Sequence, residues 1–271
     1  MRALRVFFLF LLLGSKCFAQ HKPHESPYKF NWKHEVAIAS ATIAYVGGGI
    51  ALDYTRKGLT PAQIGSLNPS DINSFDRIAL GQQGEREGLA SDILLGTSFV
   101  LPAAVLAVKR CRADALILGL MWIEVAGLTL GTTEFVKSLV LRNRPYVYNT
   151  SLAVDQKTHR DARMSFFSGH TSATAAFSFF GAKVFSDYSD NNTHKALVWT
   201  GAVILPAVVG YLRVRAGKHF PTDVIAGYLV GGAIGYLVPF LHKRKPLIEG
   251  LTLAPYSSGR ASLGVYAGYK F

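Results

Sequence analysis

Six long apolar segments restrict the fold of this chain more than any other feature of its sequence. They cover residues 36–52, 89–108, 115–136, 171–185, 196–214 and 224–241. Most lack the alternation of a half-buried strand and are too long to be one, so they are predicted to be helices. A bilayer crossing takes about 20 apolar residues, and most of the segments approach that length. The sequence therefore predicts an all-α fold, a six-helix bundle that is transmembrane.

Composition narrows the class of protein further. Of the 271 residues, 49% are hydrophobic and only 17% are charged, against roughly 25% charged in soluble domains. The net charge of +12 is spread between apolar segments and forms no basic arm. This distribution favours a membrane surface or small anionic substrates and argues against nucleic acid as a partner. Cys17 and Cys111 are too few for a disulfide framework or a thiolate metal site.

The first 19 residues have the pattern of a signal peptide. Arg2 and Arg5 precede an apolar run over residues 6–13, and a cleavage site follows at Ala19. We therefore predict a signal peptide over residues 1–19. An uncleaved anchor is the alternative, although the run is short for a bilayer crossing.

Basic residues at the ends of the segments predict an orientation. Lys109, Arg110 and Arg112 lie between the second and third segments, and residues 242–245 after the last segment are also basic. The positive-inside rule places both groups in the cytoplasm. Six crossings then leave residue 20 inside, whereas a cleaved leader leaves it outside. Either the leader or one crossing is misread, or the helices form an exported bundle on a membrane surface, as the mean hydropathy of +0.23 allows.

Three further stretches have recognisable patterns. Residues 53–88 form a long polar connection, which is typical of a lid or binding element but equally of an ordered surface loop. The last apolar segment holds Gly227, Gly231 and Gly235, a spacing that favours close helix packing. Residues 246–271 alternate apolar and polar residues around a Ser-Ser-Gly turn, so they are predicted to be a β-hairpin tail of unknown role.

Two short segments carry groups suited to binding an oxyanion. Lys137 and Arg144 lie seven residues apart, so both can face one side of a helix end, and Arg142 can serve there as a lipid-headgroup anchor. Ser168, Gly169 and His170 immediately precede an apolar helix. Ser is a good N-cap, and the free N–H groups of a helix start bind phosphate oxygens. His170 is suited to proton transfer near neutral pH.

A third segment adds a possible nucleophile. His219 and Asp223 lie four residues apart across Pro221, which favours a helix start. Asp223 can therefore accept from one ring nitrogen of His219 and leave the other nitrogen as a nucleophile. Arg213 can supply a bidentate phosphate contact. Each segment alone is more typical of an ordinary helix end, but all three fall at predicted helix ends on the same side of the bundle.

Together these residues resemble the type 2 phosphatidic acid phosphatase and vanadium haloperoxidase superfamily, whose signature is K-x6-RP, PSGH and SR-x5-H-x3-D. Lys137 and Arg144 match the first part, Ser168 to His170 the second, and Arg213, His219 and Asp223 the third. The resemblance predicts a family domain over residues 36–241. The chain departs from the signature at two positions, where Phe167 replaces the proline and Leu212 the serine.

The resemblance also implies roles for the matched residues. His219 would attack phosphorus and form a phosphohistidine, Asp223 would orient it, and His170 would protonate the leaving oxygen. The residues implied to bind phosphate are Lys137, Arg144, Ser168, Gly169 and Arg213. No metal and no cofactor is implied, because the cationic side chains stabilise the transferred group.

The function predicted in this way is a metal-independent phosphatase, a phosphoric monoester hydrolase, that acts on lipid phosphomonoesters or pyrophosphates. Its partners would be the lipid substrate and the membrane, and its location the bacterial inner membrane with the site facing the periplasm. Three alternatives stay open: a soluble periplasmic acid phosphatase, a vanadate-dependent haloperoxidase and a catalytically silent lipid-binding membrane protein. The periplasm, with the protein associated with a membrane, is the alternative location.

Overall fold

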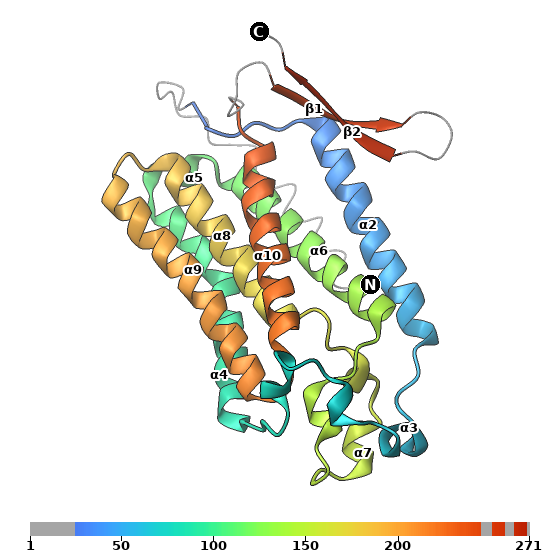
Figure 1. Cartoon of the computed structure of the whole chain (residues 1–271). Helices are drawn as coiled ribbons and strands as arrows, with labels where there is room; N and C mark the ends of the chain where they lie inside the picture. The colour runs from blue at the N-terminus through green and yellow to red at the C-terminus, as the bar shows by residue number, and fades with distance from the viewer. Residues whose placement is uncertain (1–24, 245–250, 258–262, 270–271) are drawn as a thin grey trace, which may run out of the picture.

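The computed structural model describes residues 25–244, 251–257 and 263–269, and its long helices form one bundle (Figure 1). The predicted signal peptide, residues 1–19, lies outside the described residues. The long helices are α2 (Trp32–Thr55), α4 (Glu85–Val100), α6 (Ala115–Val140), α8 (Gly169–Tyr188), α9 (Asn192–Arg215) and α10 (Pro221–Leu241). The helical bundle expected from the apolar segments is thus present in the described part of the chain.

Short elements connect the long helices. They are α3 (Pro61–Gly65), η1 (Pro69–Asp71), η2 (Asp76–Ala79), η3 (Leu101–Ala107), α5 (Lys109–Ala113), η4 (Pro145–Tyr148), α7 (Val154–Lys157) and η5 (Arg160–Arg163). The apolar segment predicted over residues 89–108 is divided between α4 and η3. Pro102 lies at this change, where it lacks the N–H that a continued α-helix would use.

Five helical segments in the described residues are long and apolar enough to cross a membrane, whereas the sequence predicts six crossings. The five are Trp32–Thr55, Glu85–Ala107, Ala115–Tyr148, Asn192–Arg215 and Pro221–Leu241. Helix α8 is absent from this set because it is rich in Ser, Thr and Ala and contains Lys183. It is also the central helix, packed against α4, α6, α9 and α10. Its surface therefore faces other helices, so the helices around it, and not α8, have to carry the apolar outer surface.

Local sequence signals set the helix ends that later form the site. Ser168 caps α8 and accepts a hydrogen bond from the N–H of Thr171, as its type predicts. Helix α10 begins at Pro221, a favoured first residue. Helix α6 ends where Leu141 adopts a left-handed conformation with φ of 50°, and its N–H bonds to the carbonyl of Lys137. The chain then turns away toward Pro145.

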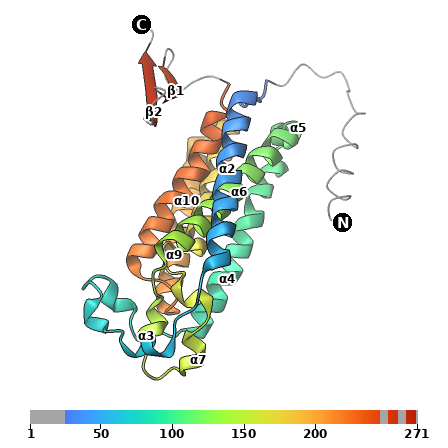
Figure 2. The same cartoon turned by 90° about the vertical axis from the view of Figure 1, so that its right-hand side faces the viewer.

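Helix α2 lies at one edge of the bundle, along α6 (Figure 2). Its start is fixed to the end of α10, where Tyr28 pairs with Lys243 and the N–H of Lys29 bonds to the carbonyl of His242. Beyond this end of the bundle, strands β1 (Leu251–Ser257) and β2 (Leu263–Tyr269) pair antiparallel, with Leu251 opposite Tyr269. These strands fall in the range for which a β-hairpin tail is predicted, and the remaining residues of that range lie outside the described ones.

The glycine repeat of α10 allows its backbone to approach α8 closely, as its spacing predicts. A Cβ on Gly231 would lie 1.9 Å from the carbonyl oxygen of Ser172, and one on Gly235 would lie 2.1 Å from that of Ala176. A Cβ on Gly227 would lie 2.5 Å from the carbonyl oxygen of Ser168. The three contacts hold the start of α8 in place, and two residues of the predicted phosphate site are there.

We expect Gly231→Ala to destabilise the bundle by about 1–3 kcal/mol, because the added methyl group meets backbone that has little room to move. Gly201→Ala on α9 is the matched control, since nothing lies within 4 Å of its added Cβ. Thermal unfolding of the two purified variants in detergent measures the difference. Equal unfolding temperatures for both would contradict the close packing of α8 and α10.

Candidate active site

The three motif segments meet at the end of the bundle near α3 and α7 (Figure 1). Lys137 is in the last turn of α6, His170 in the first turn of α8 and Arg213 in the last turn of α9. Asp223 is in the first turn of α10, and His219 lies just before that helix. Lys137, Arg144, Ser168, Arg213, His219 and Asp223 are all buried. The structure thus brings together every residue that the sequence predicts for the site.

His219 is oriented by a backbone carbonyl. Its Nδ1 lies 2.8 Å from the carbonyl oxygen of Ser165. Because a carbonyl only accepts, Nδ1 carries the proton in this hydrogen bond and Nε2 keeps a free lone pair. Burial, followed by the positive charges of Arg144, Lys137 and Arg213, holds the pKa of His219 well below its usual value. The ring is therefore neutral, which is the form a nucleophile requires.

The prediction of a hydrogen bond between Asp223 and His219 is wrong. Asp223 Oδ2 lies 3.7 Å from His219 Nδ1. It accepts instead from the hydroxyl of Ser165 at 2.5 Å and from the N–H of Phe220 at 2.8 Å. The reason is that Asp223 caps its own helix and fixes Ser165, the residue whose carbonyl holds His219. Asp223 thus acts on the histidine through Ser165.

Arg142 points into the protein and is not the lipid-headgroup anchor that the sequence suggests. Its Nη1 donates to Asp223 Oδ1 at 2.5 Å and its Nη2 to Asp76 Oδ2 at 2.7 Å. Its guanidinium also covers the ring of Phe220, 4.3 Å from the centroid. Arg142 therefore joins the end of α6 to the start of α10.

Asp76 comes from the long connection over residues 53–88 and is fully buried. Its carboxylate accepts from the N–H and the hydroxyl of Thr222, from Asn73 and from Arg142. Burial alone would raise the pKa of Asp76, but these hydrogen bonds lower it below its ordinary value. Asp76 is therefore ionised. Through it, the connection over residues 53–88 binds Arg142 and Thr222 and so contacts the site.

Asp92 of α4 links the predicted proton donor to one predicted phosphate ligand. Its Oδ1 lies 2.7 Å from His170 Nε2 and 3.2 Å from Arg213 Nη1. Burial, followed by the charge of Arg213, lowers the pKa of His170 to about 4, whereas Asp92 acts to raise it. Asp92 therefore favours the protonated form of His170 that acid catalysis needs.

The remaining predicted ligands surround the same space. Arg144 is held by the carbonyl and carboxylate of Asp161 at 2.9 and 2.6 Å and by the carbonyl of Lys218 at 3.3 Å. A Cβ on Gly169 would lie 3.5 Å from Lys137 Nζ and 3.0 Å from Thr133 Cγ2. The lysine ammonium therefore lies close to the start of α8, and Thr133 is the neighbour that a side chain at residue 169 would crowd.

A cleft of about 640 Å³ opens beside these residues. Asp92, Asp161, Arg213 and Lys218 line part of it, and Tyr146 adds an aromatic wall. This volume can admit a phosphate with part of its leaving group. Of the predicted phosphate ligands, Arg213 is the one that lines this cleft.

Sequence reasoning missed five residues that shape this site: Asp76, Asp92, Arg142 in its inward role, Asp161 and Ser165. Ser165 stands in the segment already singled out, three residues before Ser168. Asp92 lies in an apolar segment, where a lone carboxylate is itself a signal of function. Asp76 and Asp161 lie in polar connections and carry no such signal.

Buried cations and a helix start around a neutral histidine are the groups that proteins use to bind oxyanions. The PAP2 superfamily profile matches residues 115–246, a range that contains all three motif segments. Residues 115–246 thus match the superfamily whose motifs they resemble.

Individual relatives match over shorter stretches. An undecaprenyl-diphosphatase of Sulfolobus acidocaldarius is 35% identical over 77 residues, 23% of this chain and 37% of the relative. A lipid A 4'-phosphatase of Porphyromonas gingivalis is 27% identical over 133 residues, 48% of this chain and 53% of the relative. The match thus spans about half or less of each relative's length. A transmembrane PAP2-type phosphatidylglycerolphosphate phosphatase from Bacillus subtilis, a solved structure, superimposes with a TM-score of 0.41 and 20% identity, over 76% of this chain and 91% of the other.

We expect Arg142→Ala to lower the free energy of unfolding by about 3 kcal/mol, because it leaves two buried carboxylates without their shared cation. Arg110→Ala is the matched control. Arg110 forms a 3.8 Å ion pair with Asp190 in which both side chains are exposed, so its loss costs about 1 kcal/mol or less. Thermal unfolding in detergent compares the two. A similar loss in both variants would show that Arg142 does not hold the network together.

Proposed function

We propose that this protein is a phosphatase that hydrolyses lipid phosphomonoesters or pyrophosphates through a phosphohistidine. The observation that carries the proposal is the state of His219: it is neutral, its Nδ1 is committed to the carbonyl of Ser165, and three buried cations lie around it. That arrangement leaves Nε2 as a nucleophile where an anion is attracted. The names of the relatives, an undecaprenyl-diphosphatase and a lipid A 4'-phosphatase, support phosphate on a lipid as the target.

In the proposed first step, the lone pair of His219 Nε2 attacks phosphorus and the bond from phosphorus to the leaving oxygen breaks. His170 donates its proton to that oxygen, so the lipid leaves as an alcohol or as a phosphate. In the second step His170 takes a proton from water, the water oxygen attacks phosphorus, and the bond from phosphorus to Nε2 breaks. This returns both histidines to their starting states.

The proposed phosphate ligands supply the charge that the transition state requires. Lys137, Arg144 and Arg213 are buried cations, and the start of α8 adds the backbone N–H of Gly169. The N–H of Ser168 is bonded to the carbonyl of Asp223, so Ser168 contributes as the residue that caps α8. Preorganised donors of this kind stabilise developing negative charge without a metal ion. The proposed reaction is therefore metal-independent.

Exposed apolar side chains favour a membrane-embedded enzyme over a soluble one. Large apolar side chains project from the outer faces of the long helices, among them Ile43, Ile50, Leu197, Ile204 and Leu229. Such faces suit lipid and would be unusual in water. We propose that residues 36–241 form the phosphatase domain in the bacterial inner membrane.

The proposed orientation places the site on the outer, periplasmic face. The basic helix α5 and residues Lys243 and Arg244 lie at the opposite end of the bundle from the site, where the positive-inside rule expects the cytoplasm. Because Tyr28 pairs with Lys243, the chain enters and leaves the bundle on one side. This orientation starts the chain in the cytoplasm, whereas cleavage of a signal peptide after Ala19 would leave the new N-terminus in the periplasm. A cleaved signal peptide therefore fits the alternative, an exported bundle that rests on the membrane.

We expect His219→Ala to reduce phosphate release from lipid phosphates by roughly a thousandfold or more, because the nucleophile is lost. The assay uses the purified protein with a panel of phosphatidic acid, phosphatidylglycerophosphate, polyprenyl pyrophosphate and lipid A. His194→Ala, at the exposed start of α9, is the matched control. Full activity of a folded His219→Ala variant would overturn the mechanism.

We expect Asp92→Asn to move the alkaline limb of the pH profile of kcat to lower pH. Activity requires protonated His170 and falls as pH rises through the pKa of that group. Asp92 raises this pKa against burial and Arg213, so its removal lowers the pKa and the limb follows. Glu85→Gln, a change in another acidic residue of the cleft, is the control and leaves the limb in place. A limb that stays fixed or moves upward in Asp92→Asn would contradict the role of His170 as the acid.

A further inference from the structure

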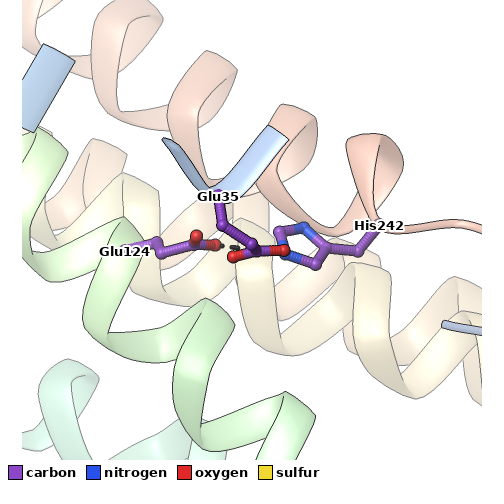
Figure 3. Close-up of side chains that lie close together, drawn as sticks. All are labelled: Glu35, Glu124 and His242. Atoms are coloured by element: carbon purple, nitrogen blue, oxygen red, sulfur yellow. Dashed lines mark ion pairs between the residues drawn. The ribbon is translucent and has the colours of Figure 1, made fainter. Parts of the chain in front are cut away.

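A second cluster of ionisable side chains lies at the end of the bundle opposite the proposed active site. Glu35 comes from the first turn of α2, Glu124 from α6 and His242 from the end of α10, and the three side chains converge (Figure 3). One ligand atom from each lies within 4.8 Å of the others. The proposed phosphatase mechanism uses none of these residues.

His242 presents a free nitrogen to the two carboxylates. The residue is 1% exposed, and its Nδ1 lies 2.9 Å from the carbonyl oxygen of Val238. Since that carbonyl only accepts, Nδ1 carries a proton, and Nε2 is the nitrogen that faces the carboxylates and can bind a metal ion. Nε2 lies 3.0 Å from Glu35 Oε1 and 3.4 Å from Glu124 Oε2. A histidine fixed in this way by a backbone carbonyl has the tautomer and orientation of a metal ligand.

The polar atoms of the cluster lack hydrogen-bond partners. Both carboxylate oxygens of Glu35, Oε2 of Glu124 and Nε2 of His242 are buried and form no hydrogen bond. Among the described residues, no lysine or arginine forms an ion pair with either glutamate. Two buried carboxylates side by side repel each other unless a proton or a cation lies between them. A single proton, on the imidazole or between the carboxylates, balances only one of the two negative charges.

We propose that Glu35, Glu124 and His242 bind a divalent transition-metal ion of the Zn²⁺ or Mn²⁺ type. Imidazole and carboxylate together are the ligands that such ions take in proteins. One dication neutralises the two carboxylates and fills the coordination of all the unsatisfied atoms at once. With ligands from α2, α6 and α10, the ion fastens the edge helix α2 to the bundle, so its role is structural.

The test is metal binding by the whole purified chain in detergent. The protein is treated with chelator, exchanged into buffer with Zn²⁺ or with Mn²⁺, freed of unbound metal and measured by elemental analysis. We expect about one equivalent per chain for the wild type, and at least about tenfold weaker binding for Glu124→Gln or His242→Asn. Glu85→Gln and His194→Ala are matched controls that retain the metal. A metal content near zero in the wild type, or one unchanged in both ligand variants, would overturn the site.

A second measurement separates this site from folding defects and from the active site. Added Zn²⁺ or Mn²⁺ should raise the unfolding temperature of the chelator-treated wild type and of the inactive His219→Ala variant equally, but not that of Glu124→Gln. An unfolding temperature that does not respond in the wild type, or that responds equally in Glu124→Gln, would contradict the proposal. A wild type that binds the ion but releases no phosphate would refute the proposed function alone.

Discussion

The carboxylate of Asp223 is the constraint on which the rest of the proposed site depends. It is fully buried, and it accepts from Arg142, from Ser165 and from the N–H of Phe220, the residue before its own helix. Through Arg142 it is linked to Asp76, and through Ser165 to His219. One carboxyl group thus joins the start of α10, the end of α6, the long connection and the segment before α8. Because removal of a partner would leave a buried charge unpaired, these elements hold one another in register.

The positions of the predicted site residues followed from sequence, because helix ends are marked locally. Ser168 caps α8, Pro221 begins α10, and the seven-residue spacing keeps Lys137 and Arg144 near one helix end. Which groups touch could not be predicted in the same way. The acceptor for His219 is a backbone carbonyl, which every residue has, so its identity leaves no trace in residue types. The inward role of Arg142 depends on Asp76, 66 positions away.

Helix α8 shows the same limit for the fold. Its segment is the least apolar in character of the six, since it is rich in Ser, Thr and Ala and contains Lys183. A helix of that composition is poorly suited to face lipid. Its place at the centre, against four other helices, explains the hydroxyl-rich sequence. Small residues there allow the backbones of α8 and α10 to approach closely. Such close packing stabilises the association of helices in lipid. The sequence pattern identified the glycines of α10 but not the buried position of the partner helix.

Charge balance distinguishes the two ends of the bundle. At the proposed active site, burial and the charges of nearby cations, Lys137 and Arg213 among them, lower the pKa values of both histidines, so a bound phosphate dianion would offset these charges and favour protonated His170. At the other end, two carboxylates face one imidazole, and a dication would complete the balance. Helix α2 shows why such an ion would be useful. Its outer face carries exposed Ile43 and Ile50, and in lipid these gain nothing from burial. Close packing on α6 and a polar link to α10 are then what keep α2 in place.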